Sequence, residues 1–421
     1  MATTTAPPFG VSTSRQLIHP GWRVTLAGTA VNLALGILYS WSIIAGFLKQ
    51  QGWSAMQTQI PYMVACGVFA LLMVPGGRLQ DKVGPRVLVT IAGVLAGAGL
   101  ILASTMMTVL GLSICFGVMF GAAMGLGYSS TTPPAMKWFA PGKRGLITGI
   151  VVAGFGLASV YAAPLTNRLV LDHGIEKTFL ILGAVFFVVI VALAQFIANP
   201  PAGYVPEDKT APNQKKRPTA NEDVEWKKML RDKRFYSLWG MFCVGSLSGL
   251  MVIGQLKTIA AEQSGVQLGL VLVAVLAVVN ASGRVGGGIL FDRLGQQKSL
   301  LLIFVLQTFN FLLFGFYGSM VTILLGTVVA GACYGACLAV FPATTATLFG
   351  VKNLGVNYGL VFTAWGAGGV FGGLLGGLVR DMTGSFAGAY MAAAALSVVA
   401  VGLTFTLRQK ADEGVELQAA A

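Results

Sequence analysis

The chain has 421 residues, of which 55% are hydrophobic and only 10% are charged, and its mean hydropathy is +0.76. This composition excludes an ordinary soluble domain and indicates a protein that crosses a membrane many times. The net charge of +13 could suit a nucleic-acid partner, but the cations lie where membrane topology places them, so we expect no nucleic acid.

Apolar stretches of about 20 residues, the length that crosses a bilayer as a helix, recur along the whole chain. They lie near 22–47, 58–77, 87–107, 109–132, 145–168, 178–198, 235–256, 266–290, 299–318, 320–343, 356–379 and 385–407. The sequence therefore predicts an all-α integral membrane protein with 12 transmembrane helices. Its 56 glycines suit close packing of helices in lipid.

Polar segments divide the spans into two groups of six. The expected parts are a tail over 1–20, a first bundle over 21–198, a linker over 199–234, a second bundle over 235–407 and a tail over 408–421. If both tails are cytoplasmic, few cations lie outside: Lys49, Arg168, Lys177, Lys257 and Arg380. This bias follows the positive-inside rule, so we expect a multi-pass protein of the cell membrane with both termini in the cytoplasm.

The first span carries two polar side chains, Asn32 and Tyr39, whose spacing of seven places them on one helical face. They would either line a path through the bundle or form hydrogen bonds between helices. In the fourth span, Tyr128 follows the small residues Gly121 and Gly125. A buried tyrosine needs a hydrogen-bond partner, which could be a ligand carboxylate or a group of the protein core.

A short loop motif, G-x3-D-x2-G-x-R, follows the second span, and a broken copy of it follows the eighth. Its residues are Gly77, Asp81, Gly84 and Arg86, and then Gly288, Asp292 and Gly295. The glycines permit tight turns, and the aspartates can accept hydrogen bonds from helix N-terminal amides or pair with an arginine. Because the copies are separated by half the chain, the motif indicates an internal repeat of six spans.

Twelve spans in two halves, with this motif after spans 2 and 8, resemble the major facilitator superfamily over about residues 20–408. The resemblance implies the major facilitator fold, in which two pseudo-symmetric six-helix bundles rock about a central site. The motif residues would then be conformational latches and not ligands of a substrate.

Arg284 is the only charged residue that we place near the middle of a span. Asn280 lies four residues earlier on the same helical face. None of the 15 Asp and Glu residues falls in mid-span, so a buried guanidinium has no expected protein anion. It would either tie its helix to backbone carbonyls or bind the carboxylate of a small organic anion, which suits the fork of an arginine.

The segment from Lys137 to Gly149, the Gly-rich start of span 5 and Tyr39-Ser40-Trp41 resemble the monocarboxylate porters, in particular their oxalate–formate antiporter-like bacterial branch. In that branch an arginine stands at the place of Arg284. Asn280 stands at the place of the proton-coupling aspartate of the porters, and Trp365 stands at the place of a second cation in the oxalate–formate branch. The resemblance implies a secondary transporter whose lone Arg284 favours a monocarboxylate such as lactate or pyruvate over a dicarboxylate.

Several further residues complete the expected substrate site. Polar contacts would come from Asn280, Tyr128 and Tyr334, and the apolar remainder of the substrate would pack on Leu33, Phe155, Phe362 or Trp365. The resemblance implies proton-linked transport, although no carboxylate or histidine lies in mid-span. An anion exchanger of the oxalate–formate type is the alternative.

Other classes of function fit the sequence less well. No span carries a catalytic constellation or metal-ligand spacing, so we expect neither an enzyme nor a cofactor nor a bound metal. A sensor built on a transporter scaffold would need a signalling domain, for which the tails and the linker are short. The expected partners are the substrate, protons and the lipid bilayer, and the expected functional unit is a monomer.

Overall fold

The computed structural model describes residues 19–206, 223–265 and 269–407, in which the regular elements are helices. Ten of these helical segments are long and apolar enough to cross a membrane. Two of them, Pro141–Ala194 and Ala274–Phe314, far exceed the length of one span and kink at Gly174 and Gly295, so each supplies two spans. The predicted all-helical fold with 12 spans is thereby confirmed.

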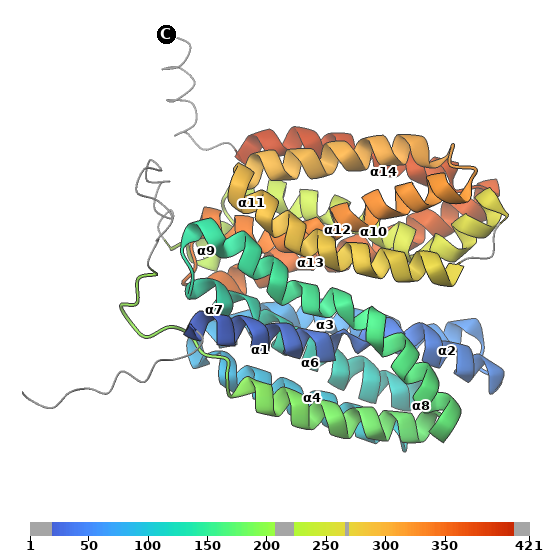
Figure 1. Cartoon of the computed structure of the whole chain (residues 1–421), viewed down its shortest axis with the longest axis horizontal. Helices are drawn as coiled ribbons and strands as arrows, with labels where there is room; N and C mark the ends of the chain where they lie inside the picture. Colours follow the sequence, from blue (N-terminus) through green and yellow to red (C-terminus); the bar gives the residue numbers. More distant parts are fainter. Residues whose placement is uncertain (1–18, 207–222, 266–268, 408–421) are drawn as a thin grey trace, which may run out of the picture.

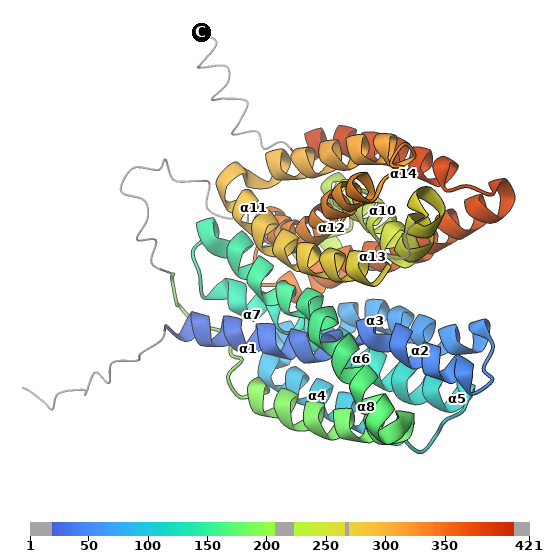
Figure 2. The same ribbon diagram turned by 45° about the vertical axis from the view of Figure 1, so that its right-hand side comes forward.

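The two halves stack against each other, with the first half in blue to green and the second in yellow to red (Figures 1 and 2). The first half contains α1 Pro20–Leu35, η1 Gly36–Ser40, α2 Trp41–Gln50, α3 Ala55–Val83, α4 Pro85–Ala103, α5 Val109–Leu112, η2 Ser113–Phe120, α6 Gly121–Ser129, α7 Thr132–Lys137, η3 Pro141–Lys143 and α8 Arg144–Ala194. The second contains α9 Trp226–Met229, α10 Lys233–Ser264, α11 Gly269–Phe314, α12 Met320–Phe349, α13 Leu354–Thr383, α14 Ala387–Thr404 and η4 Phe405–Leu407. The predicted tails, apart from residues 19 and 20, and residues 207–222 of the linker lie outside the described residues.

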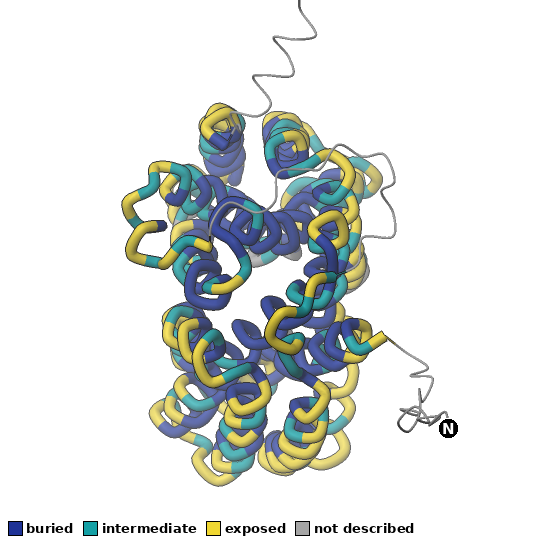
Figure 3. Tube along the Cα trace, turned by 90° about the vertical axis from the view of Figure 1, so that its left-hand side faces the viewer, coloured by how far each residue is buried: buried dark blue, intermediate teal, exposed yellow. Residues whose placement is uncertain are grey.

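Local sequence sets where the spans begin and end. Ser54 starts α3 with a reciprocal cap, since its hydroxyl accepts from the Gln57 amide at 3.2 Å and its own amide donates to Gln57 Oε1 at 2.9 Å. Gly265 and Gly384 end α10 and α13 in the left-handed conformation, with φ of 66° and 69°. Buried residues gather where helices face one another, and exposed residues form the perimeter of both bundles (Figure 3).

The halves meet most closely at one end of the molecule, where α3 ends and α13 begins. We call this the linker end, because the described linker residues from Asp223 onward lie there. A Cβ atom added at Gly77 would lie 2.0 Å from the Gly355 carbonyl oxygen, and one added at Gly288 would lie 2.1 Å from the Gly145 carbonyl oxygen. The backbones of α3 and α13, and of α11 and α8, therefore touch at glycines.

The two motif aspartates lie beside these glycine contacts, and each binds the start of a helix in the opposite half. Asp292 accepts hydrogen bonds from the amides of Gly145 and Leu146 at 2.8 and 2.7 Å. Asp81 accepts from the amides of Gly355 and Val356 at 3.3 and 3.1 Å. Both carboxylates thus compensate the positive end of a helix dipole.

The remaining motif residues shape the turns that carry these aspartates. Gly84 and Gly295 have φ of 97° and 80°, a conformation that residues with a Cβ rarely adopt. Lys137 of the same half is the cation that pairs with Asp81, with an Nζ to Oδ1 distance of 3.8 Å. The side chain of Arg86 is exposed.

The glycine contact at the linker end can be tested by adding a single methyl group. We expect Gly77→Ala to reduce transport at least tenfold, because overpacking at this backbone contact costs about 1–3 kcal/mol in the closed state. The control is Gly67→Ala in the same helix, where an added Cβ meets nothing within 4 Å. Rates are compared in proteoliposomes at equal protein content, and equal activity of the two variants would contradict the role of the contact.

Candidate functional site

A cavity lies between the two halves, deeper than the glycine contacts of the linker end. It is narrow, with room for about one water molecule, and is lined by residues of both halves, namely Phe69, Tyr128, Phe155, Arg284, Tyr334, Leu338, Phe362 and Trp365. Of these described lining residues, Arg284 alone is charged. The cavity is therefore a small aromatic chamber with one cationic group in its wall.

The Arg284 guanidinium is only 1% exposed and is bound by neutral groups. Its Nε donates to Asn280 Oδ1 at 3.2 Å, one turn earlier in α11. Its Nη1 donates to the carbonyl oxygen of Val152, which belongs to α8 of the opposite half. Its Nη2 is buried and has no hydrogen-bond partner among the described residues. A buried guanidinium in this state has both an uncompensated charge and an unused donor.

Two glycines of α8 allow the arginine to approach that helix. A Cβ added at Gly156 would lie 3.0 Å from Arg284 Nε and 3.1 Å from its Cζ, so the guanidinium lies directly against the helix surface. A Cβ added at Gly149 would lie 2.4 Å from the Arg284 carbonyl oxygen, so the backbones are also close. The position of the cation thus depends on the contact between α8 and α11.

Aromatic rings form the rest of the chamber. Trp365 stacks on Phe362, with ring centroids 5.1 Å apart, and its Nε1 donates to the Tyr334 hydroxyl at 2.9 Å. The Tyr128 ring packs edge to face on Phe155 at 5.6 Å. Such rings offer a large apolar surface, while the tyrosine hydroxyls supply polar groups within it.

A third tyrosine stands behind this wall. Tyr358 is 1% exposed, and its hydroxyl lies beside that of Tyr128 and within electrostatic reach of Arg284. The described groups that bind the cation are thus an amide and a helix carbonyl, tyrosine hydroxyls share the cavity wall with it, and no carboxylate is among the described lining residues. This arrangement is suited to holding one small anion whose apolar part faces aromatic rings.

The structure brings together most of the residues that the sequence nominated for the site. Arg284, Tyr128, Tyr334, Phe155, Phe362 and Trp365 line the cavity, and Asn280 binds Arg284 from behind. Phe69 and Leu338 also line it but were not predicted. Both are apolar residues in apolar spans, and nothing in the sequence distinguishes them from core residues.

Two nominated residues of the first span lie away from the cavity, and the side chain of a third is not described. Asn32 is fully buried and donates to the Val151 carbonyl at 2.9 Å, which is the interhelical hydrogen bond that we held as one of two interpretations. Leu33 is half-buried, and its carbonyl accepts from the Tyr161 hydroxyl at 2.9 Å. Neither is among the described residues that line the cavity. Tyr39 falls in η1, and its side chain lies outside the described parts of the structure.

Comparison with known sequences identifies one family over nearly the whole chain. The family model described as "Major Facilitator Superfamily" matches residues 24–320 and, in a second match, 263–421. The chain is 30% identical over 357 residues to "Uncharacterized MFS-type transporter YhjX" of Escherichia coli (strain K12), a match covering 82% of this chain and 85% of that protein. It is 26% identical over 372 residues to "Oxalate:formate antiporter" of Oxalobacter formigenes, covering 87% and 86%.

A shorter match links the chain to the animal carriers, and solved structures share its fold. "Monocarboxylate transporter 1" of Homo sapiens is 27% identical over 168 residues, or 39% of this chain and 33% of that protein. The crystal structure of the human organic anion transporter MFSD10 (TETRAN) aligns with a TM-score of 0.70 at 15% identity, covering 92% of this chain and 100% of that one. The transporter FucP, in the outward conformation, aligns with a TM-score of 0.67.

Because Arg284 is a buried charge bound only by neutral groups among the described residues, we expect its replacement by an apolar residue to stabilise the ligand-free protein. We expect Arg284→Met to raise the melting temperature of the ligand-free protein by about 2–4 °C, because an uncompensated buried charge is replaced by an apolar side chain. Arg293→Met is the control, since Arg293 is exposed on the same helix and its replacement should change little. A clear loss of stability in Arg284→Met alone would instead mark the arginine as a structural tie.

Proposed function

We propose that this chain, which belongs to the major facilitator superfamily of membrane transporters, is a secondary carrier of small monocarboxylates such as lactate or pyruvate. In this proposal the carrier works by alternating access, and Arg284 binds the carboxylate in the cavity between the halves. The cavity has room for only about one water molecule in this state, so it must widen to admit a substrate, and a substrate of a few atoms requires the least widening.

The observation that carries the proposal is the unused Nη2 of Arg284. This nitrogen is buried and without a hydrogen-bond partner among the described residues, and the nearest protein groups are neutral. A substrate carboxylate would supply the missing acceptor and the missing charge together. Binding would therefore be favoured because it removes the cost of keeping an unpaired guanidinium buried in the ligand-free protein.

The hydrogen bonds already made by the arginine limit how the carboxylate can bind. Asn280 occupies Nε and Val152 occupies one hydrogen of Nη1, so a symmetric two-oxygen contact through the Nε side of the fork would break the bond to Asn280. We therefore assign one carboxylate oxygen to Nη2. The Tyr334 hydroxyl, which accepts from Trp365 and lines the same cavity, is the polar group that we assign to the second oxygen or to the 2-hydroxyl or keto group.

The charge of the cavity favours a monocarboxylate over a dicarboxylate. Oxalate would bring two charges to a chamber whose described lining holds one cation. Trp365 stands where the resemblance places a second cation, and its indole is held between Phe362 and the Tyr334 hydroxyl. An unpaired second carboxylate would have to be desolvated against these rings at a cost of several kcal/mol.

Energy coupling has two candidate forms. Asn280 cannot titrate, and none of the described lining residues is an acid or a histidine, so in proton-linked transport the proton would travel with the substrate carboxylate. The second candidate is anion exchange, which the 26% identity to an oxalate:formate antiporter favours. In that case the uncompensated Arg284 would disfavour reorientation of the empty carrier.

The orientation of the closed end follows from charge. Most of the Lys and Arg residues in the described parts of the chain lie at the linker end, for example Lys82, Arg144 and Lys352. By the positive-inside rule we assign this end to the cytoplasm. The glycine contacts and the two aspartate caps then close the cytoplasmic side of the cavity.

Transport in proteoliposomes tests the substrate and the coupling. We expect uptake of labelled lactate that is inhibited by excess pyruvate and at least tenfold less strongly by oxalate, because only one carboxylate finds a cation. Faster uptake when the outside is more acidic than the inside, with no anion inside, supports proton-linked transport. A requirement for an anion inside the proteoliposomes shows exchange. Stronger inhibition by oxalate than by pyruvate would refute the one-cation argument.

The contact between Arg284 and α8 provides a second test. We expect Gly156→Ala to raise the KM for lactate about tenfold with a smaller effect on the maximal rate, because the added methyl displaces the guanidinium by a few tenths of an ångström. Gly286→Ala is the matched control, since a Cβ at this position two residues from Arg284 meets nothing within 4 Å. A KM unchanged in Gly156→Ala would show that the guanidinium does not contact the substrate.

A further inference from the structure

A short piece of the linker lies across the closed linker end, and it is fastened to the second half by backbone hydrogen bonds. We call residues Asp223 to Trp226 the strap. The Val224 amide donates to the Phe349 carbonyl at 3.0 Å, and the Val224 carbonyl accepts from Asn357 Nδ2 at 2.9 Å. Asn357 is fully buried, so loss of the strap would leave its amide without this partner.

The strap also holds the turn that leads into α13. Asp223 Oδ1 accepts from the Lys352 amide at 3.0 Å, and the Val224 carbonyl accepts from Asn353 Nδ2 at 3.4 Å. Gly350 has a φ of 82°, and a Cβ there would lie 2.4 Å from Asp223 Oδ1, so the turn fits closely against the strap. These contacts orient the first turn of α13 from one side.

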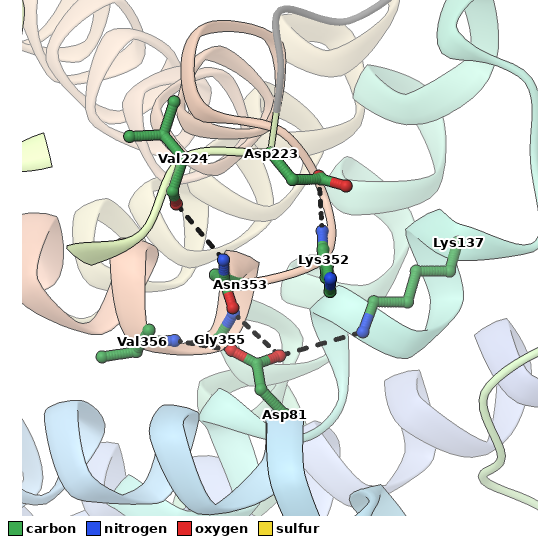
Figure 4. Close-up of polar contacts among 8 residues, drawn as sticks. All are labelled: Asp81, Lys137, Asp223, Val224, Lys352, Asn353, Gly355 and Val356. Carbon is green, nitrogen blue, oxygen red and sulfur yellow. Dashed lines mark hydrogen bonds and ion pairs between the residues drawn. The ribbon is translucent and has the colours of Figure 1, made fainter. Parts of the chain in front are cut away.

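Asp81 binds the same few residues from the other side. Figure 4 shows the run from Lys352 to Val356 lying between the strap and Asp81, with Lys137 reaching the Asp81 carboxylate. The amides of Gly355 and Val356 donate to Asp81, while the Lys352 amide and the Asn353 side chain donate to the strap. The first turn of α13 is thus bound by the strap on one side and by Asp81 of the first half on the other.

The strap reaches the first half through charge. The carboxylate of Asp223 lies within electrostatic reach of Lys137 and Arg144, both of which belong to the first half. The Arg78 guanidinium of the first half lies 5.9 Å from the centre of the Trp226 ring. The hydrogen bonds to the second half need not change when the halves separate, whereas these contacts to the first half are lost.

From this arrangement we propose that the strap is a conformational fastener, which stabilises the state closed at the linker end and opposes its opening. It presents the first turn of α13 to Asp81 and places a negative charge opposite two cations of the first half. The strap thereby adds contacts from the linker to the two pseudo-symmetric aspartate caps. The inference requires alternating access only, and it does not depend on the identity of the substrate.

Hydrogen–deuterium exchange of the purified full-length protein tests the proposal. The variants are Asp223→Asn, which removes the charge, and Val224→Pro, which removes the amide that binds Phe349. Two segments report opening, namely 353–357 beside the strap and 145–147, which contains the Gly145 and Leu146 amides that donate to Asp292 in the other aspartate cap. We expect both variants to raise exchange about fivefold in both segments, while 55–60 at the opposite end stays unchanged.

Glu225→Gln is the matched control, because it removes a neighbouring linker charge whose side chain, unlike that of Asp223, accepts no hydrogen bond from the turn before α13 or from its own helix start among the described residues. We expect it to leave exchange unchanged in all three segments. An increase confined to 353–357 would show that the strap only anchors its own turn, and would overturn the proposal. Equal exchange in Asp223→Asn and Glu225→Gln would also overturn the proposal. If Val224→Pro does not fold, the comparison of Asp223→Asn with Glu225→Gln decides the test.

Discussion

A guanidinium that is 1% exposed inside a membrane protein must be supported on every side, and much of this structure follows from how Arg284 is held. Its own helix supplies Asn280, and the facing helix supplies the Val152 carbonyl and the bare surface at Gly156. All of these groups are neutral. They reduce the cost of desolvation without cancelling the charge, and this leaves the arginine able to accept an anion.

The support of Arg284 also joins the site to the packing of the two halves. Arg284 belongs to α11, whereas Val152 and Gly156 belong to α8, so the geometry of the cation depends on a contact that crosses between the halves. The same pair of helices meets at Gly288 and Gly145 toward the linker end. Separation of the helices there would alter the groups around Arg284, so ligand affinity and conformation are physically linked.

The sequence predicted the fold because the bilayer imposes a strong constraint, whereas it predicted the site only in part. Spans of apolar residues, cations on one side and a repeated loop motif follow from general requirements of membrane proteins. Arg284 and the tyrosines stood out because polar groups are costly in lipid. Phe69 and Gly156 did not, since their roles arise from what faces them. The aspartate motif likewise indicated helix N-termini as partners, but not that these begin α8 and α13 in the opposite half.

The closure at the linker end rests mainly on backbone groups, and this has a consequence for how it opens. Glycine backbones in contact and amides that converge on one carboxylate fit in a single relative position of the helices, because neither can stretch as long side chains do. A small displacement therefore breaks the contacts together, which favours two discrete states over a continuous series. Exposed ion pairs such as that of Arg168 and Asp172, by contrast, tolerate movement and contribute little. A carrier that must never be open on both sides requires a closure of the first kind.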